Sequence, residues 1–193
     1  FPGDKVALDN KPIRNKTRRV VIAFNKPPGI TTTTDLRDKD NIISFIKFKA
    51  RIFPIGRLDK PSSGLILLTN DGDIVNKILR KENNHDKEYI VTVDKPITEA
   101  FLNKMRKGIP ILGTVTNPCK MRKLGKNKFS IILTQGLNRQ IRRMCEYCGY
   151  KVLTLKRTRI MHIALANLKV GQWRHLSKSE LQKLDMSVSQ SRK

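Results

Sequence analysis

The sequence predicts an α+β domain with a mixed, mainly antiparallel β-sheet and flanking helices. Segments of strand length recur along the chain, some uniformly apolar and some alternating between apolar and polar residues, and short amphipathic helical patterns separate them. Turn-forming residues mark the boundaries between these segments. A chain of 193 residues is long enough for one good-sized core, and it shows no internal repeat.

The first half of the chain is predicted to alternate strands and short helices. Residues 19–24 are β-rich and predict a strand, and residues 25–29 must form a loop because two prolines there remove N–H donors and fix φ. Residues 41–48 predict a short helix. Residues 64–69 are apolar without alternation, which is typical of a central strand, and residues 71–80 then suit an amphipathic helix.

The second half continues this pattern. An alternating strand at 88–93 precedes a helix that Thr98 caps and Gly108 ends. Ser177 and Glu180 form a capping box for a final helix, which we expect to end near Leu184. The other predicted elements are strands at 115–117, 119–123, 129–133 and 152–158 and a well-patterned helix at 138–148.

Three regions follow from these patterns. Residues 1–18 contain a turn, a short strand and a polar, basic stretch, so we interpret them as the end of a truncated domain followed by a linker. Residues 19–185 hold the predicted strands and helices of the main domain. Residues 186–193 are predicted to be a frayed tail.

The charge balance indicates a polyanionic partner. Lys and Arg number 40 against 16 Asp and Glu, which gives a formal net charge of +24. Nucleic acid is the leading partner for such a chain, and a basic surface that binds nothing is the weaker alternative. We expect no membrane association, because no apolar run approaches the length of a span and no long basic amphipathic helix stands out.

Cysteine usage favours a reducing compartment. The odd count of three Cys and the lack of a secretion-signal pattern predict a cytoplasmic protein. Cys145 and Cys148 form a C-x-x-C pair, but they share one face of the predicted helix with Ile141 and Met144. We therefore expect them to pack in the core rather than to bind a metal or act in redox chemistry.

One carboxylate stands out as a candidate reactive group. Asp59 lies on a predicted turn just before the apolar strand, with Arg57 two residues earlier and no His, Cys or second acid within ten residues. A lone Asp beside an arginine in so basic a chain suggests chemistry on a nucleic-acid base or sugar. By spacing alone, an ordinary turn-forming Asp before Lys60 and Pro61 is an equal alternative.

A basic cluster follows later in the chain. Between Gly136 and Ile160 there are seven basic residues and one acid, Glu146. Arg139, Arg142 and Arg143 belong to this cluster, and they open the predicted helix at 138–148. The arrangement suits contacts to phosphates, whereas a solvated basic face is the plainer alternative.

Three blocks together resemble one branch of the RNA pseudouridine synthases, which includes type A of the small ribosomal subunit together with types B, E and F of the large one. The blocks are Gly-Arg-Leu-Asp-x-x-Ser-Ser-Gly-Leu at 56–65, Lys-Glu-Tyr at 87–89 and Asn-Arg-Gln-Ile-Arg-Arg-Met at 138–144. The segment Asn-Lys-Pro-Pro-Gly at 25–29 matches the opening of that branch, and segments within 94–115 and 157–161 are most similar to type F. The resemblance spans residues 20 to about 184.

The resemblance implies a fold and a reaction. The fold is a mixed, mainly antiparallel sheet crossed by a central RNA-binding cleft. The reaction is the isomerisation of uridine to pseudouridine, in which the base leaves its C1′–N1 bond and rejoins through C5. It also implies that residues 1–11 are the last strand of a small N-terminal RNA-binding domain, most of which is missing.

The resemblance assigns roles to eight residues. Asp59 matches the nucleophile or base, and Arg142 matches the guanidinium that favours its charged form and fixes it by a forked hydrogen bond, with Arg143 as the fallback if the helix register differs. Tyr89 matches the tyrosine that stacks under the flipped uracil, although a plain core tyrosine is the alternative. The expected substrate-binding residues are Arg57, which helps to displace the nucleotide, Ile141, which packs against the tyrosine ring, Lys26, Arg139 and Arg143.

The implied enzyme needs no cofactor and no metal, and we expect a monomer that acts on ribosomal RNA of the large subunit. A transfer RNA anticodon uridine is a further expected substrate. Asp71 and Asp73 could suggest a metal site, but their place at a helix start favours capping. Two rivals stay open: a non-enzymatic ribosomal RNA-binding or assembly protein, and another RNA-modifying enzyme, for which neither a glycine-rich cofactor loop nor a carboxylate cluster is found.

Overall fold

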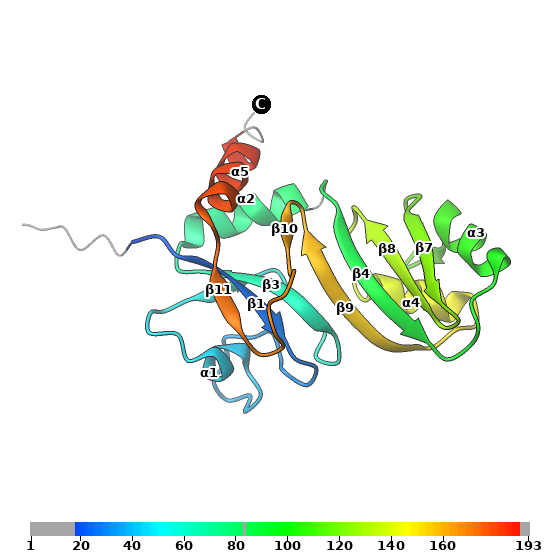
Figure 1. The fold of residues 1–193 in the computed structure, drawn as a ribbon, viewed down its shortest axis with the longest axis horizontal. Helices are drawn as coiled ribbons and strands as arrows, with labels where there is room; N and C mark the ends of the chain where they lie inside the picture. Colours follow the sequence, from blue (N-terminus) through cyan, green and yellow to red (C-terminus); the bar gives the residue numbers. More distant parts are fainter. Residues whose placement is uncertain (1–17, 83, 190–193) are drawn as a thin grey trace, which may run out of the picture.

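The computed structural model describes residues 18–82 and 84–189, and it shows an α+β fold around one mixed sheet (Figure 1). The sheet strands are β1 (Val21–Lys26), β2 (Phe53–Ile55), β3 (Ser63–Thr69), β4 (Lys87–Val93), β7 (Lys120–Gly125), β8 (Lys128–Leu133), β9 (Val152–Ile160), β10 (Ile163–Ala164) and β11 (Trp173–His175). A separate hairpin pairs β5 (Pro110–Ile111) with β6 (Thr114–Val115). The helices are α1 (Ile42–Ile46), α2 (Gly72–Glu82), α3 (Glu99–Lys107), α4 (Gln140–Tyr147) and α5 (Lys178–Ser189).

The sheet consists of two halves that meet at one parallel junction. The strand order is β11-β1-β3-β9-β4-β8-β7, with β2 paired to β3 and β10 paired to β9. All of these pairs are antiparallel except β3 with β9, which pair only through Ser63 with Lys156 and Gly64 with Arg157. We call β11, β1, β3 and β2 the first half, and β9, β10, β4, β8 and β7 the second half.

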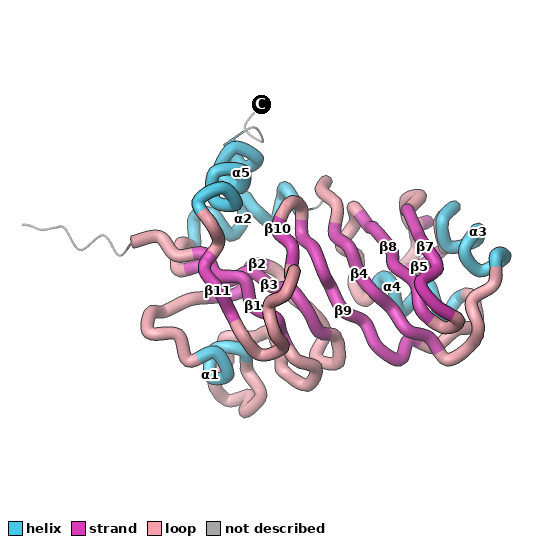
Figure 2. The backbone as a smooth tube through the Cα atoms, in the orientation of Figure 1, coloured by secondary structure: helices cyan, strands magenta, loops and turns pink. Residues whose placement is uncertain are grey.

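The two halves are covered differently. In the first half, alternate residues of β1 and β3 point into two apolar clusters, one under α2 and α5 and the other under α1. In the second half, one face of β4 and β8 packs against α3 and α4 to form a third apolar cluster. Figures 1 and 2 show α2 and α5 side by side at one end of the first half and α4 behind the strands of the second.

Most predicted elements are confirmed, and the mainly antiparallel sheet is as expected. Thr98 caps α3 by accepting a hydrogen bond from Phe101 N, and Gly108 ends that helix. At the start of α2, Asp71 Oδ1 accepts from Asp73 N at 3.0 Å, which confirms capping as a role of Asp71. Ser177 and Glu180 form the predicted capping box, because Glu180 N donates to Ser177 Oγ at 3.1 Å and Ser177 N donates to Glu180 Oε1 at 2.8 Å.

Several boundaries were predicted wrongly. Helix α4 begins at Gln140 rather than at residue 138, because Arg139 adopts a left-handed backbone with φ 48° and cannot continue the helix. Helix α5 continues to Ser189, five residues beyond the predicted end near Leu184. The short strands β2, β10 and β11 were missed because they depend on their sheet partners rather than on their own pattern.

Two further expectations concern residues at the ends of the chain. The predicted remnant domain and linker at 1–18 fall almost wholly outside the described residues, as do the last four residues of the predicted tail. None of the helices within 18–82 and 84–189 combines the length and the hydrophobicity that crossing a bilayer requires.

Candidate active site

A pocket of about 560 Å³ lies where the two halves of the sheet meet. Its wall combines the turn that carries Asp59, strands β4, β8 and β9, the residues that lead into α4 and the start of α4 itself. Residues that line it are Gly56, Arg57, Leu58, Asp59, Ser62, Leu79, Lys87, Tyr89, Leu133, Gln135, Gly136, Leu137, Asn138, Arg139, Gln140, Ile141, Arg142, Leu155 and Arg157. Five of these are basic and one is acidic, so the pocket attracts anions while it isolates a single carboxylate.

The backbone around Asp59 is held from both sides. Ser62 N donates to Asp59 O at 2.9 Å, which closes the turn. The buried Thr32 hydroxyl bonds to both backbone groups of the preceding residue, since it donates to Leu58 O at 3.1 Å and accepts from Leu58 N at 3.4 Å. The carboxylate is therefore presented by a fixed turn rather than by a free loop.

Lys26 also holds this turn, and it is not placed to bind an RNA phosphate as the resemblance implied. Its relative exposure is 0%, and its Nζ donates to the backbone carbonyls of Pro27, Ile30 and Lys60 at 3.0, 2.7 and 3.1 Å. Burial lowers the pKa of Lys26 to about 8, and the negative charge of Asp59 acts in the opposite direction. The geometry therefore supports a structural role for Lys26 in place of the expected contact to RNA.

Two arginines face the Asp59 carboxylate, and they do so unequally. Arg139 Nη1 donates to Asp59 Oδ2 at 3.2 Å, whereas Arg142 Nε lies 3.7 Å from the same oxygen. Arg142 instead donates from Nη2 to the buried Ser62 Oγ at 2.9 Å. The expected forked hydrogen bond from Arg142 to Asp59 is thus absent in this structure, because Arg142 Nη2 donates to Ser62 instead of to the carboxylate.

Arg142 is the more enclosed of the two. Its side chain is 12% exposed, compared with 44% for Arg139 and 34% for Asp59. Burial lowers the pKa of the Arg142 guanidinium, the charge of Arg139 adds to that effect, and Asp59 opposes it. Arg142 Nε is buried and has no hydrogen-bond partner among residues 18–82 and 84–189, and it points at the carboxylate from just beyond hydrogen-bond distance.

Arg143 does not serve as the fallback partner of Asp59. Its Nε donates to Asn138 O at 2.9 Å and its Nη2 to Asn138 Oδ1 at 2.8 Å, so it holds the turn that precedes α4 and is not among the lining residues. Arg57 is exposed at the pocket wall, where the resemblance expected a residue that displaces the nucleotide.

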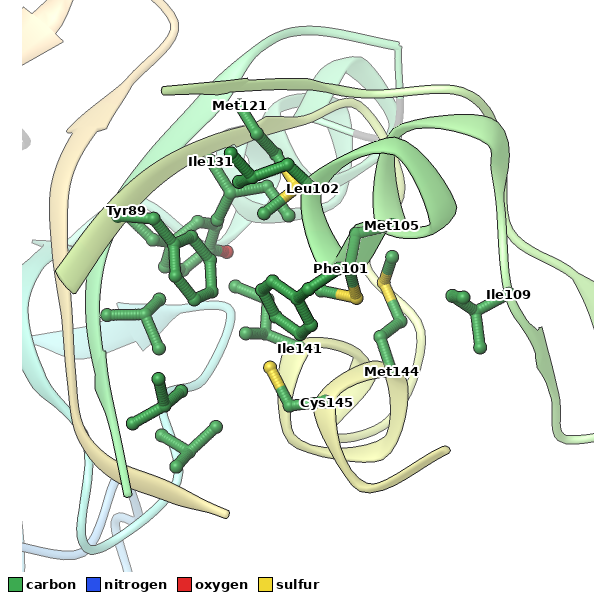
Figure 3. Close-up of a cluster of buried hydrophobic side chains, with 14 of the residues drawn as sticks. Tyr89, Phe101, Leu102, Met105, Ile109, Met121, Ile131, Ile141, Met144 and Cys145 are labelled. Atoms are coloured by element: carbon green, nitrogen blue, oxygen red, sulfur yellow. The ribbon is translucent and has the colours of Figure 1, made fainter. Parts of the chain in front are cut away.

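Tyr89 and Ile141 form the apolar part of the wall. Tyr89 is 9% exposed on β4 and Ile141 is 4% exposed on α4, and both line the pocket. Figure 3 shows these side chains converging with Phe101 of α3 in the core of the second half. Tyr89 is therefore both a core residue and a pocket residue, so the two alternatives considered for it are not exclusive.

Sequence reasoning missed several residues that build the site. Arg157 is buried, donates from Nε to Leu65 O at 2.8 Å across the sheet junction and also lines the pocket. Lys87 is buried in the same wall. Both lie inside segments that carry the family resemblance, which is the signal that could have found them. Thr32 and Ser62 hold their partners over long stretches of sequence, so no local pattern singles them out.

The cysteines belong to the core, as predicted. Cys145 is fully buried and Cys148 packs against the same cluster. Burial raises the pKa of Cys145 to about 12 and that of Cys119 to about 11, which keeps both thiols protonated. Within the described part of the chain, no three His, Cys, Asp or Glu side chains gather where they could hold a metal ion.

Comparisons with known proteins fit this geometry. The sequence profile of the family described as RNA pseudouridylate synthase matches residues 20–147. The chain belongs to this family. It is 56% identical over 182 residues to the dual-specificity RNA pseudouridine synthase RluF of Escherichia coli strain K12, an alignment that covers 93% of this chain and 63% of the relative. The F-type likeness expected from the sequence is confirmed, and the chain spans less than two thirds of that relative's length.

More distant members of the RNA pseudouridylate synthase family agree. The ribosomal large subunit pseudouridine synthase B of Bacillus subtilis strain 168 is 37% identical over 173 residues, which cover 86% of this chain and 71% of that protein. A solved structure described as a pseudouridylate synthase superposes with a TM-score of 0.78 at 30% identity, covering 86% of this chain and 74% of the other. The fold of this chain is thus the pseudouridine synthase fold.

Proposed function

We propose that this chain isomerises a uridine to pseudouridine in RNA, with Asp59 as the reacting carboxylate. The observation that carries the proposal is a lone Asp in a basic pocket, facing Arg139 and Arg142 and bordered by Tyr89 and Ile141. Membership of the RNA pseudouridylate synthase family supports the same reaction.

The proposed reaction needs no outside oxidant or reductant. The C1′–N1 bond of uridine breaks, a C1′–C5 bond forms, the hydrogen on C5 leaves as a proton and N1 takes up a proton. An ionised Asp59 either attacks C1′, abstracts a ribose proton so that uracil leaves by elimination, or attacks C6 of the ring. Each route uses the ionised carboxylate, which faces the guanidiniums of Arg139 and Arg142 at 3.2 and 3.7 Å.

The pocket also offers a place for a nucleotide taken out of its stack. Its volume of about 560 Å³ lies within the range of roughly 300–1,000 Å³ that is usual for ligand pockets. The Tyr89 ring and Ile141 supply an apolar surface for the base, while Arg57 and Arg139 are exposed at the rim where phosphates would pass. We assign the catalytic roles to Asp59, Tyr89 and Arg142, and substrate contacts to Arg57, Arg139 and Ile141.

Ribosomal RNA of the large subunit is the proposed substrate, and a transfer RNA anticodon uridine is proposed as a second one. The printed names of two relatives support this assignment, since the Escherichia coli protein is called dual-specificity and the Bacillus subtilis protein is named for the large ribosomal subunit. We further propose that the chain acts without a cofactor, as a monomer in the cytoplasm, where its three free cysteines stay reduced.

Tritium release from RNA that carries uridine labelled at C5 tests the proposal. Wild-type protein should release tritium, and Asp59→Asn should bind the same RNA without measurable release. Asp40→Asn is the matched control, because Asp40 is an exposed acid on a nearby loop that pairs with Lys60 at 3.1 Å and lies outside the pocket lining. Turnover by Asp59→Asn at the control rate would favour the non-enzymatic RNA-binding alternative, in which Asp59 is only a turn residue.

A further inference from the structure

The second half of the sheet has an open face on the side away from α3 and α4. Strand pairing places Tyr89, Val91, Phe129 and Leu155 on the covered face, and all four are buried in the core. Their neighbours in sequence therefore point to the opposite face. In the orientation of Figure 1 these strands lie in front of α4, so the open face is turned toward the viewer. We call it the open sheet face.

The open sheet face carries two rows of side chains that cross all four strands, and each row begins and ends with a cation. The first row runs from Arg122 through Ser130 and Ile90 to Lys156. The second row runs from Lys120 through Ile132 and Glu88 to Arg159. The outer strands of such a four-stranded sheet lie about 14 Å apart, since neighbouring strands are spaced by roughly 4.8 Å.

The charge of this face is strongly one-sided. Lys128 adds a fifth cation beside Thr92 and Thr154, whose hydroxyls are hydrogen-bonded to each other. Glu88 is the single acid that the pairing places on the face, and Arg159 Nε already neutralises it at 3.1 Å. Four cations are left, on Lys120, Arg122, Lys128 and Lys156. The centre between them is neutral: Ile90 and Ile132 are half-buried there, and Ser130 beside them is buried.

This surface is separate from the pocket. The same strands supply both, but alternate residues point in opposite directions: Tyr89 and Arg157 line the pocket, whereas Ile90 and Lys156 lie on the open sheet face. An RNA held at the pocket alone would leave these four cations unpaired on the far side of the sheet.

We propose that the open sheet face is a second RNA-binding surface, which holds the phosphate backbone of a substrate large enough to reach around the sheet. This inference rests on the proposed action on RNA. The cations at the two edges fit phosphates, and the neutral centre fits sugars or bases laid across the strands. A protein partner is less suited to the face, because an interface core is depleted of charged residues and here cations frame a small apolar centre.

Lysine acetylation of the wild-type protein tests the inference without any substitution. Three lysines of the face, Lys120, Lys128 and Lys156, should be protected when a long transcript of ribosomal RNA from the large subunit is bound. They should stay reactive with a short stem-loop that is only large enough for the pocket. Exposed lysines elsewhere, such as Lys107 and Lys169, are the internal controls and should stay reactive with both RNAs.

A charge-neutral variant then measures the contribution to affinity. The variant K120Q/R122Q/K128Q/K156Q should bind the long transcript at least tenfold more weakly than wild type. The slope of its log affinity against log salt concentration should flatten by up to about 3.6, because each of four phosphate contacts contributes roughly 0.7–0.9. The matched control K49Q/R51Q/K107Q/K169Q removes the same charge from exposed sites on other elements and should lose clearly less. Both variants should release tritium from the short stem-loop at the wild-type rate.

Equal losses in the two variants, or face lysines that stay reactive with the long transcript, would overturn the inference. Protection by a ribosome-assembly protein in place of RNA would overturn it as well. These results do not depend on the proposed reaction. Lysine protection and RNA affinity can both be measured whether or not the protein releases tritium. If wild-type protein released no tritium while the face lysines were protected, the proposed reaction would fail and this surface would stand.

Discussion

Asp59 accepts its guanidinium hydrogen bond from Arg139, whose backbone lies in the left-handed region at φ 48° and whose side chain is 44% exposed. Arg142 approaches the same carboxylate oxygen from the buried side, 3.7 Å away, and stays anchored to Ser62. One partner of Asp59 is thus open to solvent and the other is enclosed by the protein. The two pairs should differ in strength, because solvent and salt screen an exposed ion pair much more than a buried one.

Removing each arginine should separate these contributions. Arg139→Ala should lower the single-turnover rate by at most about fivefold, since an exposed ion pair contributes roughly 0.2–1 kcal/mol. Arg142→Ala should lower it by roughly 30- to 150-fold, because about 2–3 kcal/mol is lost when a partly buried charge loses its enclosed partner. Tritium release with saturating protein measures both rates, and Arg80→Ala, on the exposed surface of α2, is the control. A larger loss from Arg139 than from Arg142 would show that the exposed pair dominates.

Ser62 should act as a positioning residue for Arg142. Its buried hydroxyl accepts the Nη2 hydrogen bond at 2.9 Å, while its backbone N–H, which substitution leaves in place, donates to Asp59 O. Ser62→Ala should lower the single-turnover rate by roughly tenfold, since a hydrogen bond to a charged group is worth about 1.5 kcal/mol or more. RNA affinity should be unchanged, because the charge of the pocket is unchanged.

The neighbouring serine provides the control for this effect. Ser63 Oγ donates to Leu155 O at the long distance of 3.5 Å and reaches no arginine. Ser63→Ala should therefore keep the wild-type rate, and Ser62→Thr should restore most of the activity by returning a hydroxyl. A rate loss in Ser62→Ala that Ser62→Thr fails to recover, together with a lower midpoint of thermal unfolding, would point to a packing role instead.

The sequence predicted those parts of the molecule that local patterns determine. Alternation along 88–93 identified a core strand, and the spacing of Ile141, Met144 and Cys145 identified the buried face of α4. The resemblance paired Asp59 with Arg142, and in the structure both residues line one pocket. The strands and the helix face are readable because each depends on residues close together in the chain, whereas the pairing of Asp59 with Arg142 came from the resemblance.

Features that depend on distant partners were not readable. Lys26 seemed free to bind phosphate because nothing near it in sequence reveals that Lys60 O, 34 residues later, will accept its hydrogen bond. The unequal roles of Arg139 and Arg142 follow from the left-handed turn before α4 and from the competing hydroxyl of Ser62. Neither feature can be derived from helical periodicity. Periodicity predicts side-chain directions only within a regular helix, and Arg139 lies just before α4 begins.

Acid should weaken the packing of α5 through Glu180. Both oxygens of this carboxylate accept hydrogen bonds from Arg174, at 2.7 and 2.9 Å, and these bonds lower the pKa of Glu180 from 4.5 to about 2. Since the pKa is lower in the folded state, the pair stabilises the fold fully above pH 4.5 and loses its effect as the pH falls toward 2. The contribution should be on the order of 1–2 kcal/mol after screening at this partly exposed site.

Urea unfolding of wild type and Glu180→Gln at several pH values checks this linkage. The free energy of unfolding should differ between the two proteins at pH 6, and the difference should shrink steadily between pH 4.5 and pH 2. Asp185→Asn serves as a control, because its pair with Arg19 at 2.9 Å is more exposed. A difference that stays constant over this range would contradict the prediction. It would show that Glu180 stabilises the fold through its hydrogen bonds with Ser177 and not through its charge.

Gly64 should be the least replaceable residue of the sheet junction. Its backbone has φ 107°, and a Cβ built there would lie 2.2 Å from Arg157 O and 2.6 Å from Arg157 N. Because these are backbone atoms of β9, no rotamer change can relieve the clash, and β3 must move away from β9. Gly64→Ala should lower the free energy of unfolding by roughly 3–5 kcal/mol. It should also displace Arg157, which lines the pocket, so any folded fraction should lose tritium-release activity.

Gly125→Ala is the matched control at the far edge of the same sheet. A Cβ at Gly125 would meet Lys128 Cβ at 3.7 Å, an ordinary contact. This variant should change the free energy of unfolding by less than about 1 kcal/mol in urea titration. The junction is held by two register pairs of β3 with β9, and Ile160 and Ile163 of the second half share the apolar cluster under α2 and α5. The defect in Gly64→Ala should therefore appear as a lowered midpoint of unfolding for the whole sheet. A single transition with wild-type midpoint would show that the junction tolerates the added methyl group and that β3 and β9 are less closely coupled than their register indicates.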